Sequence, residues 1–365
     1  MSGASLLVAA CTVLVTVLPA APSDTGEEAP YPRSNVIESI TFDESTHWQE
    51  ALGSDQFGTT WGSDGSLYVA WGDGAGFGAT DYREQHGPNR ASLGVSRIEG
   101  PASAPEVINV WGGKNPLTKQ PSTRGKTSAG VIAVGETIYL YVLEQDVWTR
   151  AALWSTRDRG NAWTNHGWLI DEPDGAFTGL GILQFGRANA NARDDFVYGY
   201  AETGFTNGVG LFRVPKESIA ERGAYEFYAG TKPSGSPIWS ANVKDRKPVF
   251  TDPNGAEWGV TCVYNAPLRR YLLAVRHNGE SGNWGLFDAS EPWGPWTTVA
   301  YGRELPEWTW TPAGASQRPS YIHTFPSKWI SEDGLTLWHI YDRNDSFNLA
   351  RATLRLRVKL NADQH

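Results

Sequence analysis

The chain is poor in cysteine, with only Cys11 and Cys262 among its 365 residues. Cys11 lies in an apolar N-terminal run, and removal of that run would leave Cys262 without a partner in the chain. We therefore predict no internal disulfide, so the stability of the fold must come from its hydrophobic core. Cys262 lies in the apolar run WGVTCVYN and is predicted to be a small buried hydrophobe, not a reactive thiol.

Positive charge is also scarce, because 31 Lys and Arg residues face 40 Asp and Glu residues, for a net charge of −9. The sequence contains no basic run that could offset this balance. Both observations argue against nucleic acid or an anionic membrane surface as a partner. A polyanionic glycan is disfavoured on the same ground, unless a local basic pocket binds it.

Several catalytic and metal-binding motifs are missing. The seven His residues are scattered, and neither C-x-x-C nor H-E-x-x-H occurs, so no zinc site is predicted. The chain has no G-x-S-x-G nucleophile elbow and no P-loop. We expect no cofactor, and no motif supports a structural calcium ion in the central channel.

The longest apolar run is N-terminal, and residues 1–21 contain no charged side chain. Its apolar part, Leu6 to Leu18, has the length of a signal-peptide core and is too short to span a bilayer. The alternative is a buried first strand or helix of the domain. Val8 to Cys11 loosely resembles a lipoprotein cleavage box, but the apolar run continues past it, so lipidation is not expected.

We therefore expect a signal peptide at residues 1–21, a Pro- and Glu-containing linker at residues 22–33, and one domain at residues 34–365. The protein is predicted to act outside the cytoplasm, as a periplasmic or extracellular monomer that does not insert into a membrane.

Aromatic residues and glycine are abundant, with 17 Trp, 14 Tyr and 40 Gly. Flat amphipathic rings on a turn-rich β framework suit the binding of sugars. The alternative role for most of the Trp residues is to pack between neighbouring sheets.

Five hairpins share one design, in which an apolar or Gly-rich strand, a polar turn and an aromatic, β-branched strand follow one another. They are QFGTTWGSDGSLYVAW, TSAGVIAVGETIYLYV, ILQFGRANANARDDFVYGY, GVTCVYNAPLRRYLLAV and PSKWISEDGLTLWHIY. The aromatic markers of their second strands are Tyr68, Tyr139, Tyr198, Tyr271 and Trp338. They recur at intervals of roughly 59 to 73 residues, which is the spacing of four-stranded propeller blades with long loops.

The two ends of the domain together supply the missing part of one interval. A strand near VIESITF is therefore predicted to pair beside ARATLRLRV and close the ring, which would also protect the sheet edges. Seven blades would need shorter intervals than those observed. We predict an all-β fold, a five-bladed propeller of four-stranded antiparallel blades, with one short helical candidate at Pro215 to Glu221.

The segment from Thr156 to Trp163 fits the Asp-box pattern found on turns of sialidase-like propellers. In that pattern the aspartate caps a tight turn through backbone N–H groups and the tryptophan packs beneath it. We predict a structural role for Asp158, not a catalytic one.

Cross-strand geometry indicates where chemistry could lie, because residues equidistant from a hairpin turn face each other. Asp55 and Asp73 are symmetric about Asp64 in the first hairpin, so two carboxylates should meet at its open end. Like charges held close raise one pKa and leave the other group ionised, which is the division of labour that glycoside hydrolysis requires. Asp55 and Asp73 are the predicted catalytic pair.

The same offset places further polar and aromatic residues at the open ends of the other hairpins. Phe325 is predicted near Arg343 on this basis. The predicted substrate-binding residues are Lys126 opposite Glu144, Gln184 opposite Glu202, Trp258 opposite Arg276, and the neighbouring His277 and Asp342. A solvated, charge-paired surface is the alternative for each residue of this second group.

Five segments carry a resemblance to a known family: QFGTTWGSDGSLYVAWGDGAGFG, WGGKNP, GKTSAG, LQFGRANANARDD and FPSKWISEDGLTLW. They resemble a large bacterial family of secreted five-bladed propellers whose characterised branch contains endo-D-arabinanases. The resemblance extends from about Asp55 to Leu354. It implies that the aspartates entering the first inner strand and leaving the second, here Asp55 and Asp73, take part in hydrolysis. The sequence departs from that branch at the glycine-rich Gly74 to Gly78, so the substrate stays open.

These observations favour a secreted glycoside hydrolase that acts on a polysaccharide, such as an arabinan-type glycan. Two alternatives stay open. A polysaccharide lyase would use a base such as His86, His277 or a tyrosine, with Lys126, Arg90 or Arg276 neutralising a uronate. A non-catalytic glycan-binding propeller would use the aromatic rings and leave the aspartates to structural hydrogen bonds.

Overall fold

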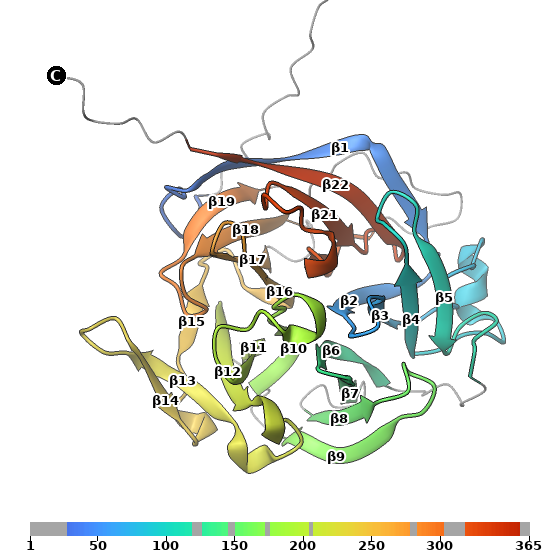
Figure 1. Ribbon diagram of the computed structural model, residues 1–365, viewed down its shortest axis with the longest axis horizontal. Coiled ribbons are helices and arrows are strands. Elements are labelled where there is room, and N and C mark those ends of the chain that lie inside the picture. The colour runs from blue at the N-terminus through green and yellow to red at the C-terminus, as the bar shows by residue number, and fades with distance from the viewer. Residues whose placement is uncertain are drawn as a thin grey trace, which may run out of the picture.

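The computed structural model describes residues 28–118, 126–144, 150–171, 176–203, 207–277, 283–302 and 318–357. These residues form five antiparallel sheets around a central axis, so the predicted five-bladed β-propeller is confirmed (Figure 1). The only helices among them are short 3-10 turns: η1 (Tyr82–His86), η2 (Arg187–Asn189), η3 (Lys216–Ser218), η4 (Arg222–Ala224), η5 (Val243–Asp245) and η7 (Ser327–Trp329). None of these turns has the length or the hydropathy of a membrane span.

The first strand of each blade lies nearest the axis, and the first strands contact one another around the ring (Figure 1). Blade one holds β2 (Asp55–Trp61), β3 (Leu67–Gly72), β4 (Leu93–Glu99) and β5 (Glu106–Trp111); blade two holds β6 (Lys126–Val134), β7 (Thr137–Glu144), β8 (Arg150–Thr156) and β9 (Thr164–Asp171); blade three holds β10 (Ala176–Ile182), β11 (Phe196–Thr203), β12 (Gly208–Pro215) and β15 (Pro248–Thr251); blade four holds β16 (Glu257–Asn265), β17 (Arg270–His277), β18 (Asn283–Ala289) and β19 (Thr297–Gly302); blade five holds β20 (His323–Thr324), β21 (Thr336–Tyr341), β22 (Phe347–Leu356) and β1 (Ile37–Glu50).

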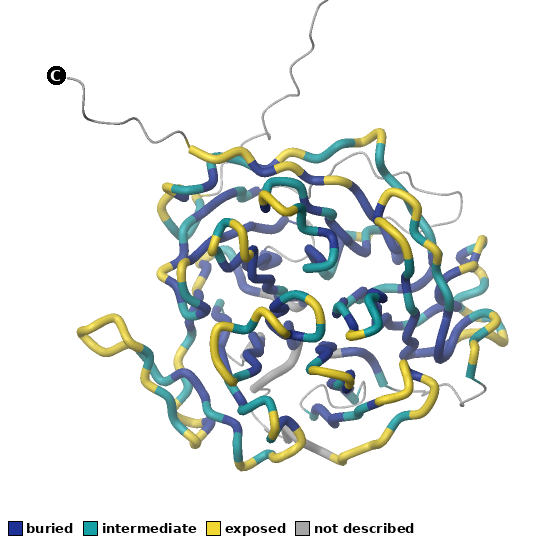
Figure 2. The backbone as a smooth tube through the Cα atoms, viewed as in Figure 1, coloured by how far each residue is buried: buried dark blue, intermediate teal, exposed yellow. Residues whose placement is uncertain are grey.

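Blade three carries an extra hairpin. Its two strands, β13 (Glu226–Thr231) and β14 (Pro237–Ser240), extend the sheet from one half of β12, while β15 pairs with the other half. The hairpin projects from the ring, and its tip is exposed (Figures 1 and 2). The short helical candidate at Pro215 to Glu221 forms as the single 3-10 turn η3, after which the chain enters η4.

The ring closes as the sequence predicts, with β1 antiparallel beside β22 and Ile40 opposite Leu354. The predicted signal peptide lies outside the described residues, as does the first half of the predicted linker, residues 22–27. The end of that linker packs on blades three and four, because Arg33 forms a parallel bridge with Thr298 of β19 and the Tyr31 ring lies 5.2 Å from that of Phe250 in β15.

Apolar side chains pack between neighbouring blades because the second strand of each blade is buried on both faces. The markers Tyr68, Tyr139, Tyr198, Tyr271 and Trp338 all lie on those second strands. Trp71 is fully buried between blades five and one, where its Nε1 donates to Ser96 Oγ at 2.9 Å. Each large apolar side chain buried this way contributes about 1.5–3 kcal/mol, so a ring without a disulfide among its described residues has a sufficient core.

The Asp-box turn between β8 and β9 has the predicted structural role. Asp158 Oδ1 accepts hydrogen bonds from Thr156 Oγ1 at 2.7 Å and from Ala162 N at 2.9 Å. The Trp163 ring lies 5.9 Å from that of Trp111 in the neighbouring blade. The turn therefore fixes an outer loop against the next blade.

Candidate active site

One face of the ring gathers the ends of all five second strands, and we call this face the mouth. The second strands end there at Gly72, Glu144, Thr203, His277 and Tyr341. The turns that join first and second strands, such as the turn around Asp64, lie on the opposite face. The predicted catalytic residues must therefore be sought where β2 begins and β3 ends.

Asp55 and Asp73 do meet at the mouth, one residue out of the predicted register. Asp55 begins β2 and pairs with Gly72, and Asp73 follows directly in a left-handed conformation with φ of 44°. The shift arises from an irregularity in the pairing between Asp55 and Gly58. Both residues are partly exposed to solvent, and the Asp73 side chain is a little over a third exposed.

Gly72 leaves room for the Asp55 carboxylate. A Cβ at position 72 would lie 2.6 Å from Asp55 Oδ1 and 2.8 Å from Thr127 Oγ1. No side chain tolerates either distance, so glycine here lets the carboxylate lie against the β3 backbone. The position of Asp55 is thus determined in part by a residue that has no side chain.

Asp342 lies directly behind this pair, fully buried just beyond the end of β21. Its Oδ2 accepts from Gln56 N at 2.9 Å, and its Oδ1 accepts from Tyr321 N at 2.6 Å and Ile322 N at 3.0 Å. Both oxygens of this carboxylate therefore accept hydrogen bonds from backbone N–H groups. The side chain is fully buried, so it exposes neither oxygen to a substrate at the mouth.

Two arginines face the acidic cluster. Arg90 NH2 lies 2.6 Å from Asp73 Oδ1, and each of these side chains is a little over a third exposed. Arg318 Nε lies 3.3 Å from Asp345 Oδ2, in the turn that follows Asp342. The cations therefore flank the cluster on the side of Asp73 and Asp345, while Asp55 has no ion pair closer than 4 Å among the described residues.

The surroundings shift the pKa values of the two catalytic candidates to different extents. Burial raises the pKa of Asp55 well above its usual value, and the charges of Asp342, Asp73 and Asp345 raise it further. Burial also raises the pKa of Asp73, but Arg90, Arg318 and His86 act in the opposite direction. The pKa of Asp55 is therefore raised more strongly than that of Asp73, whose neighbouring cations oppose the effect of burial.

Burial also raises the pKa of Asp342, to about 6, although its three backbone donors favour the charged form. Two buried carboxyls thus lie side by side, and the charge of one disfavours ionisation of the other.

On blade two, Lys126 and Glu144 are cross-strand partners as predicted, and Lys126 Nζ lies 3.2 Å from Glu144 Oε1. Both side chains are about a quarter exposed at the mouth. Each therefore neutralises the other beside the carboxylate pair.

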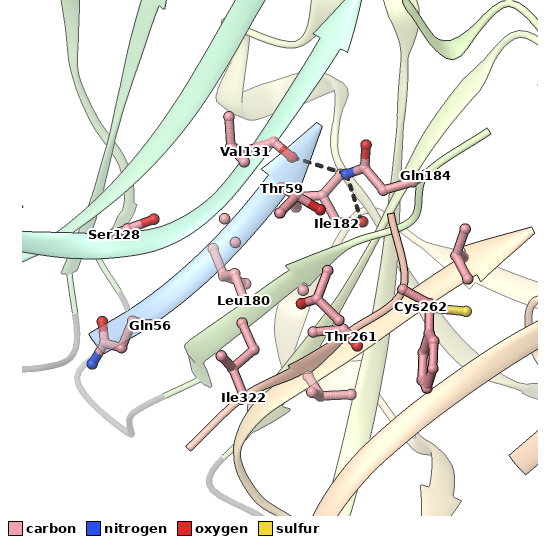
Figure 3. A pocket seen from close by; sticks show the side chains of 18 of the residues that line it. Gln56, Thr59, Ser128, Val131, Leu180, Ile182, Gln184, Thr261, Cys262 and Ile322 are labelled. Carbon is pink, nitrogen blue, oxygen red and sulfur yellow. Dashed lines mark hydrogen bonds between the residues drawn. The ribbon is translucent and has the colours of Figure 1, made fainter. Parts of the chain in front are cut away.

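On blade three, the predicted pairing of Gln184 with Glu202 is wrong, because Glu202 lies opposite Thr178. The long connection from β10 to β11 includes η2, so the hairpin is not symmetric about its turn. Gln184 is buried in the central channel, where its Nε2 donates to Val131 O at 2.9 Å and Ile182 O at 3.0 Å (Figure 3). The Glu202 side chain lies outside the described residues.

The channel itself is narrow. Its cavity measures about 50 Å³ and is lined by the first strands of the blades, with Gln56 toward one end and the fully buried Cys262 in its wall (Figure 3). Small-molecule sites usually enclose about 300–1,000 Å³. A sugar chain would therefore have to cross the mouth and could not enter the channel.

On blade four, Arg276 lies opposite Glu257, one residue from the predicted partner Trp258, whose side chain lies outside the described residues. The Arg276 guanidinium lies over the Tyr321 ring, 4.9 Å from its centre. His277 is fully buried and stacks on Tyr301 at 4.1 Å.

On blade five, Phe325 is not near Arg343, contrary to prediction. It packs against His339 at 4.9 Å, because η7 interrupts the hairpin and displaces its register.

Three residues of the site escaped sequence reasoning: Gln56, Arg318 and Asp345. Asp345 follows Asp342 by three residues in a turn, and this spacing could have indicated that a second carboxylate lies at the mouth. Gln56 gave none, because its contribution is a backbone N–H held at a φ of 58°. Within the described part of the chain, no three His, Cys, Asp or Glu side chains form a cluster suited to a metal ion.

A family model described as a domain of unknown function, DUF4185, matches residues 43–313, which include the whole of blades one to four. The chain belongs to the DUF4185 family. The match contains Asp55 and Asp73, and it ends before Asp342. A comparison of this DUF4185 chain with curated proteins finds no match.

Solved structures share the fold of this DUF4185 chain. One is a protein from Bacteroides ovatus ATCC 8483, assigned only provisionally as a hydrolase, at 12% identity with a TM-score of 0.57, covering 89% of this chain and 96% of that one. Another is an alpha-L-arabinofuranosidase from Podospora anserina in complex with cellotriose, at 13% identity with a TM-score of 0.50, covering 87% and 95%. At such identities the likeness shows a common propeller fold and nothing more.

Proposed function

We propose that the protein is a secreted glycoside hydrolase that cleaves a polysaccharide across the mouth of the propeller. The observation that carries the proposal is the Asp55–Asp73 pair, whose members share one end of a hairpin but have opposite electrostatic surroundings. Paired carboxyls with separated pKa values are what this reaction needs.

Asp55 acts as the general acid. Its carboxyl gives its proton to the glycosidic oxygen as the bond from that oxygen to the anomeric carbon breaks, so the leaving sugar departs as a neutral alcohol. Asp73 either takes a proton from the water that attacks the anomeric carbon, or attacks that carbon itself to form a glycosyl-enzyme that water then hydrolyses. Arg90, at 2.6 Å, favours the charged form of this carboxylate, which either role requires.

We infer that the substrate is a neutral polymer that contains furanose sugars, such as an arabinan. The resemblance of five sequence segments to the endo-D-arabinanase branch supports this substrate class, and so does the acidic balance of the chain. The neighbour from Podospora anserina with the same fold is an alpha-L-arabinofuranosidase in complex with cellotriose, which is compatible with sugar binding on this scaffold.

The ion pairs at the mouth favour hydrolysis over β-elimination. A lyase would need cations available to neutralise a uronate. Lys126 is paired with Glu144, and Arg90 with Asp73, so the carboxylates beside them would repel that uronate.

The test is digestion of a panel of neutral furanose and pyranose polymers, with uronic-acid polymers included. We expect new reducing ends from a neutral polymer and no ultraviolet absorbance from an unsaturated uronate. Asp55→Asn and Asp73→Asn should each lower kcat by at least about 10³-fold while leaving the melting temperature close to that of the parent.

The matched control is Asp195→Asn, since Asp195 lies on the opposite face with its side chain 99% exposed. It should leave kcat unchanged. Full turnover in both Asp55→Asn and Asp73→Asn would show that these residues are not the catalytic pair. Binding of a glycan without any product would favour a non-catalytic propeller.

A further inference from the structure

Asp342 occupies an unusual place in the fold, because it joins the last blade to the start of the first. It follows β21 in blade five, and its Oδ2 accepts from Gln56 N in blade one at 2.9 Å. The residue before Gln56 is Asp55. One hydrogen bond thus runs from the blade that closes the ring to the backbone beside the proposed acid.

The segment that Asp342 holds has a conformation that requires support. Gln56 has a φ of 58°, in the left-handed region that residues other than glycine rarely adopt. Such a conformation persists only where its surroundings over-determine it. The bond to Asp342 and a side-chain contact, 2.7 Å between Gln56 Oε1 and Thr127 Oγ1, are the two anchors that hold it.

The other oxygen of Asp342 is fixed independently. Its Oδ1 accepts from Tyr321 N at 2.6 Å and Ile322 N at 3.0 Å, so the carboxylate cannot turn away without losing two further bonds. The side chain is fully buried. Asp342 is therefore a rigid acceptor with one oxygen committed to blade five and one to the Asp55–Gln56 segment.

From this geometry we propose that Asp342 is a positioning residue that holds the Asp55–Gln56 segment across the junction of blades five and one and thereby aims the Asp55 carboxyl at the substrate. The inference rests on the proposed function for the role of Asp55, but the contact itself does not. Asp342 reaches the reaction only through Asp55, which distinguishes it from a sugar ligand.

The charges around the pair agree with such a role. Among the like charges that raise the pKa of Asp55, Asp342 has the largest effect, ahead of Asp73 and Asp345, and Arg318 acts in the opposite direction. Arg276 lies beyond, over the ring of Tyr321. Loss of the Asp342 charge should therefore lower the pKa of Asp55 as well as release its backbone.

The principal test is Asp342→Asn. An amide offers only one acceptor, so retention of the bonds from Tyr321 N and Ile322 N would turn its NH2 toward Gln56 N and break that contact. We expect kcat to fall by about 10²-fold with KM little changed, and the alkaline limb of the pH–rate profile to move to lower pH. A rise in KM with an unchanged profile would make Asp342 a substrate ligand and overturn the proposal.

The control is Asp288→Asn. Asp288 is an equally buried carboxylate, 2.7 Å from Arg270, near the end of β18 on the face opposite the mouth. Its loss should lower the melting temperature without moving the pH profile. An equal shift in both variants would mean that the profile reports general destabilisation.

A second readout does not depend on activity. In protein labelled with carbon-13 at the Asp carboxyls, the Asp55 signal is assigned by its loss in Asp55→Asn and then titrated. Its pKa should fall in Asp342→Asn and stay raised in Thr127→Val, which removes only the side-chain anchor of Gln56. An unchanged value in Asp342→Asn, or an equal fall in Thr127→Val, would overturn the positioning role even in a protein without hydrolase activity.

A third measurement needs no variant and applies if Asp342→Asn fails to fold. The Gln56 amide, bonded to a buried carboxylate, should exchange its hydrogen far more slowly than an amide in the unfolded chain. Exchange at the unfolded rate would show that the bond is absent in solution and would refute the proposal.

Discussion

Gly72→Ala should slow the reaction without replacing a charged group. The added Cβ would lie 2.6 Å from Asp55 Oδ1, which is 0.8 Å inside the 3.4 Å at which ordinary contact begins, and 2.8 Å from Thr127 Oγ1. Thr127 is itself buried, so the Asp55 carboxyl is the group that must move. A displacement approaching 1 Å at a catalytic group costs roughly 10²-fold in rate.

The accompanying loss of stability should be modest, about 1–3 kcal/mol, the usual cost of one extra methyl group in a packed site. The assay is kcat and KM on the polymer that the wild type cleaves, together with the melting temperature. Gly58→Ala is the matched control in the same strand, because its Cβ would meet only Val131 Cγ1, at 3.9 Å. Wild-type kcat in Gly72→Ala would refute the placement of Asp55.

Two further predictions concern stability. Reducing agent should leave the melting temperature unchanged, and a thiol reagent should label Cys262 only on unfolding, since burial raises the pKa of its thiol; labelling of the native protein would contradict this. Burial lowers the pKa of His339 to about 3, so the unfolded chain binds its proton first and stability falls as the pH drops below about 6.5, by up to 1.4 kcal/mol per pH unit. Urea unfolding of His339→Phe should show a shallower fall, and an equal slope would contradict the assignment.

The periodic features of the sequence were enough to predict the fold. Five hairpins with an aromatic second strand specify five blades, and the leftover ends specify the closure of β1 beside β22. These features are local, so each could be recognised without knowledge of its neighbours. The Asp158 turn was predictable for the same reason.

Cross-strand pairs were predictable only where the ladder is regular. Lys126 lies opposite Glu144 as expected, despite an irregularity further along the strand. Gln184 and Phe325 were misplaced because η2 and η7 lengthen one side of their hairpins, and nothing in the residue pattern marks those turns. Asp55 and Asp73 were one residue out for a comparable reason, yet they still meet at the mouth.

The function of Asp342 could not be read from sequence because it depends on a contact between residues that are 286 positions apart. Its position at the mouth suggested a sugar ligand. Its burial and three backbone donors instead favour the support of another residue, which only the closed ring makes visible.

Hydrolysis at the Asp55–Asp73 pair is most directly tested in water labelled with heavy oxygen. A polymer that the wild type cleaves is digested in this water, and the products are analysed by mass spectrometry. Hydrolysis by this pair should add one labelled oxygen for each bond broken, and no product should form when Asp55→Asn or Asp73→Asn replaces the wild type. Products that carry no label would mean elimination in place of hydrolysis and would contradict the central claim.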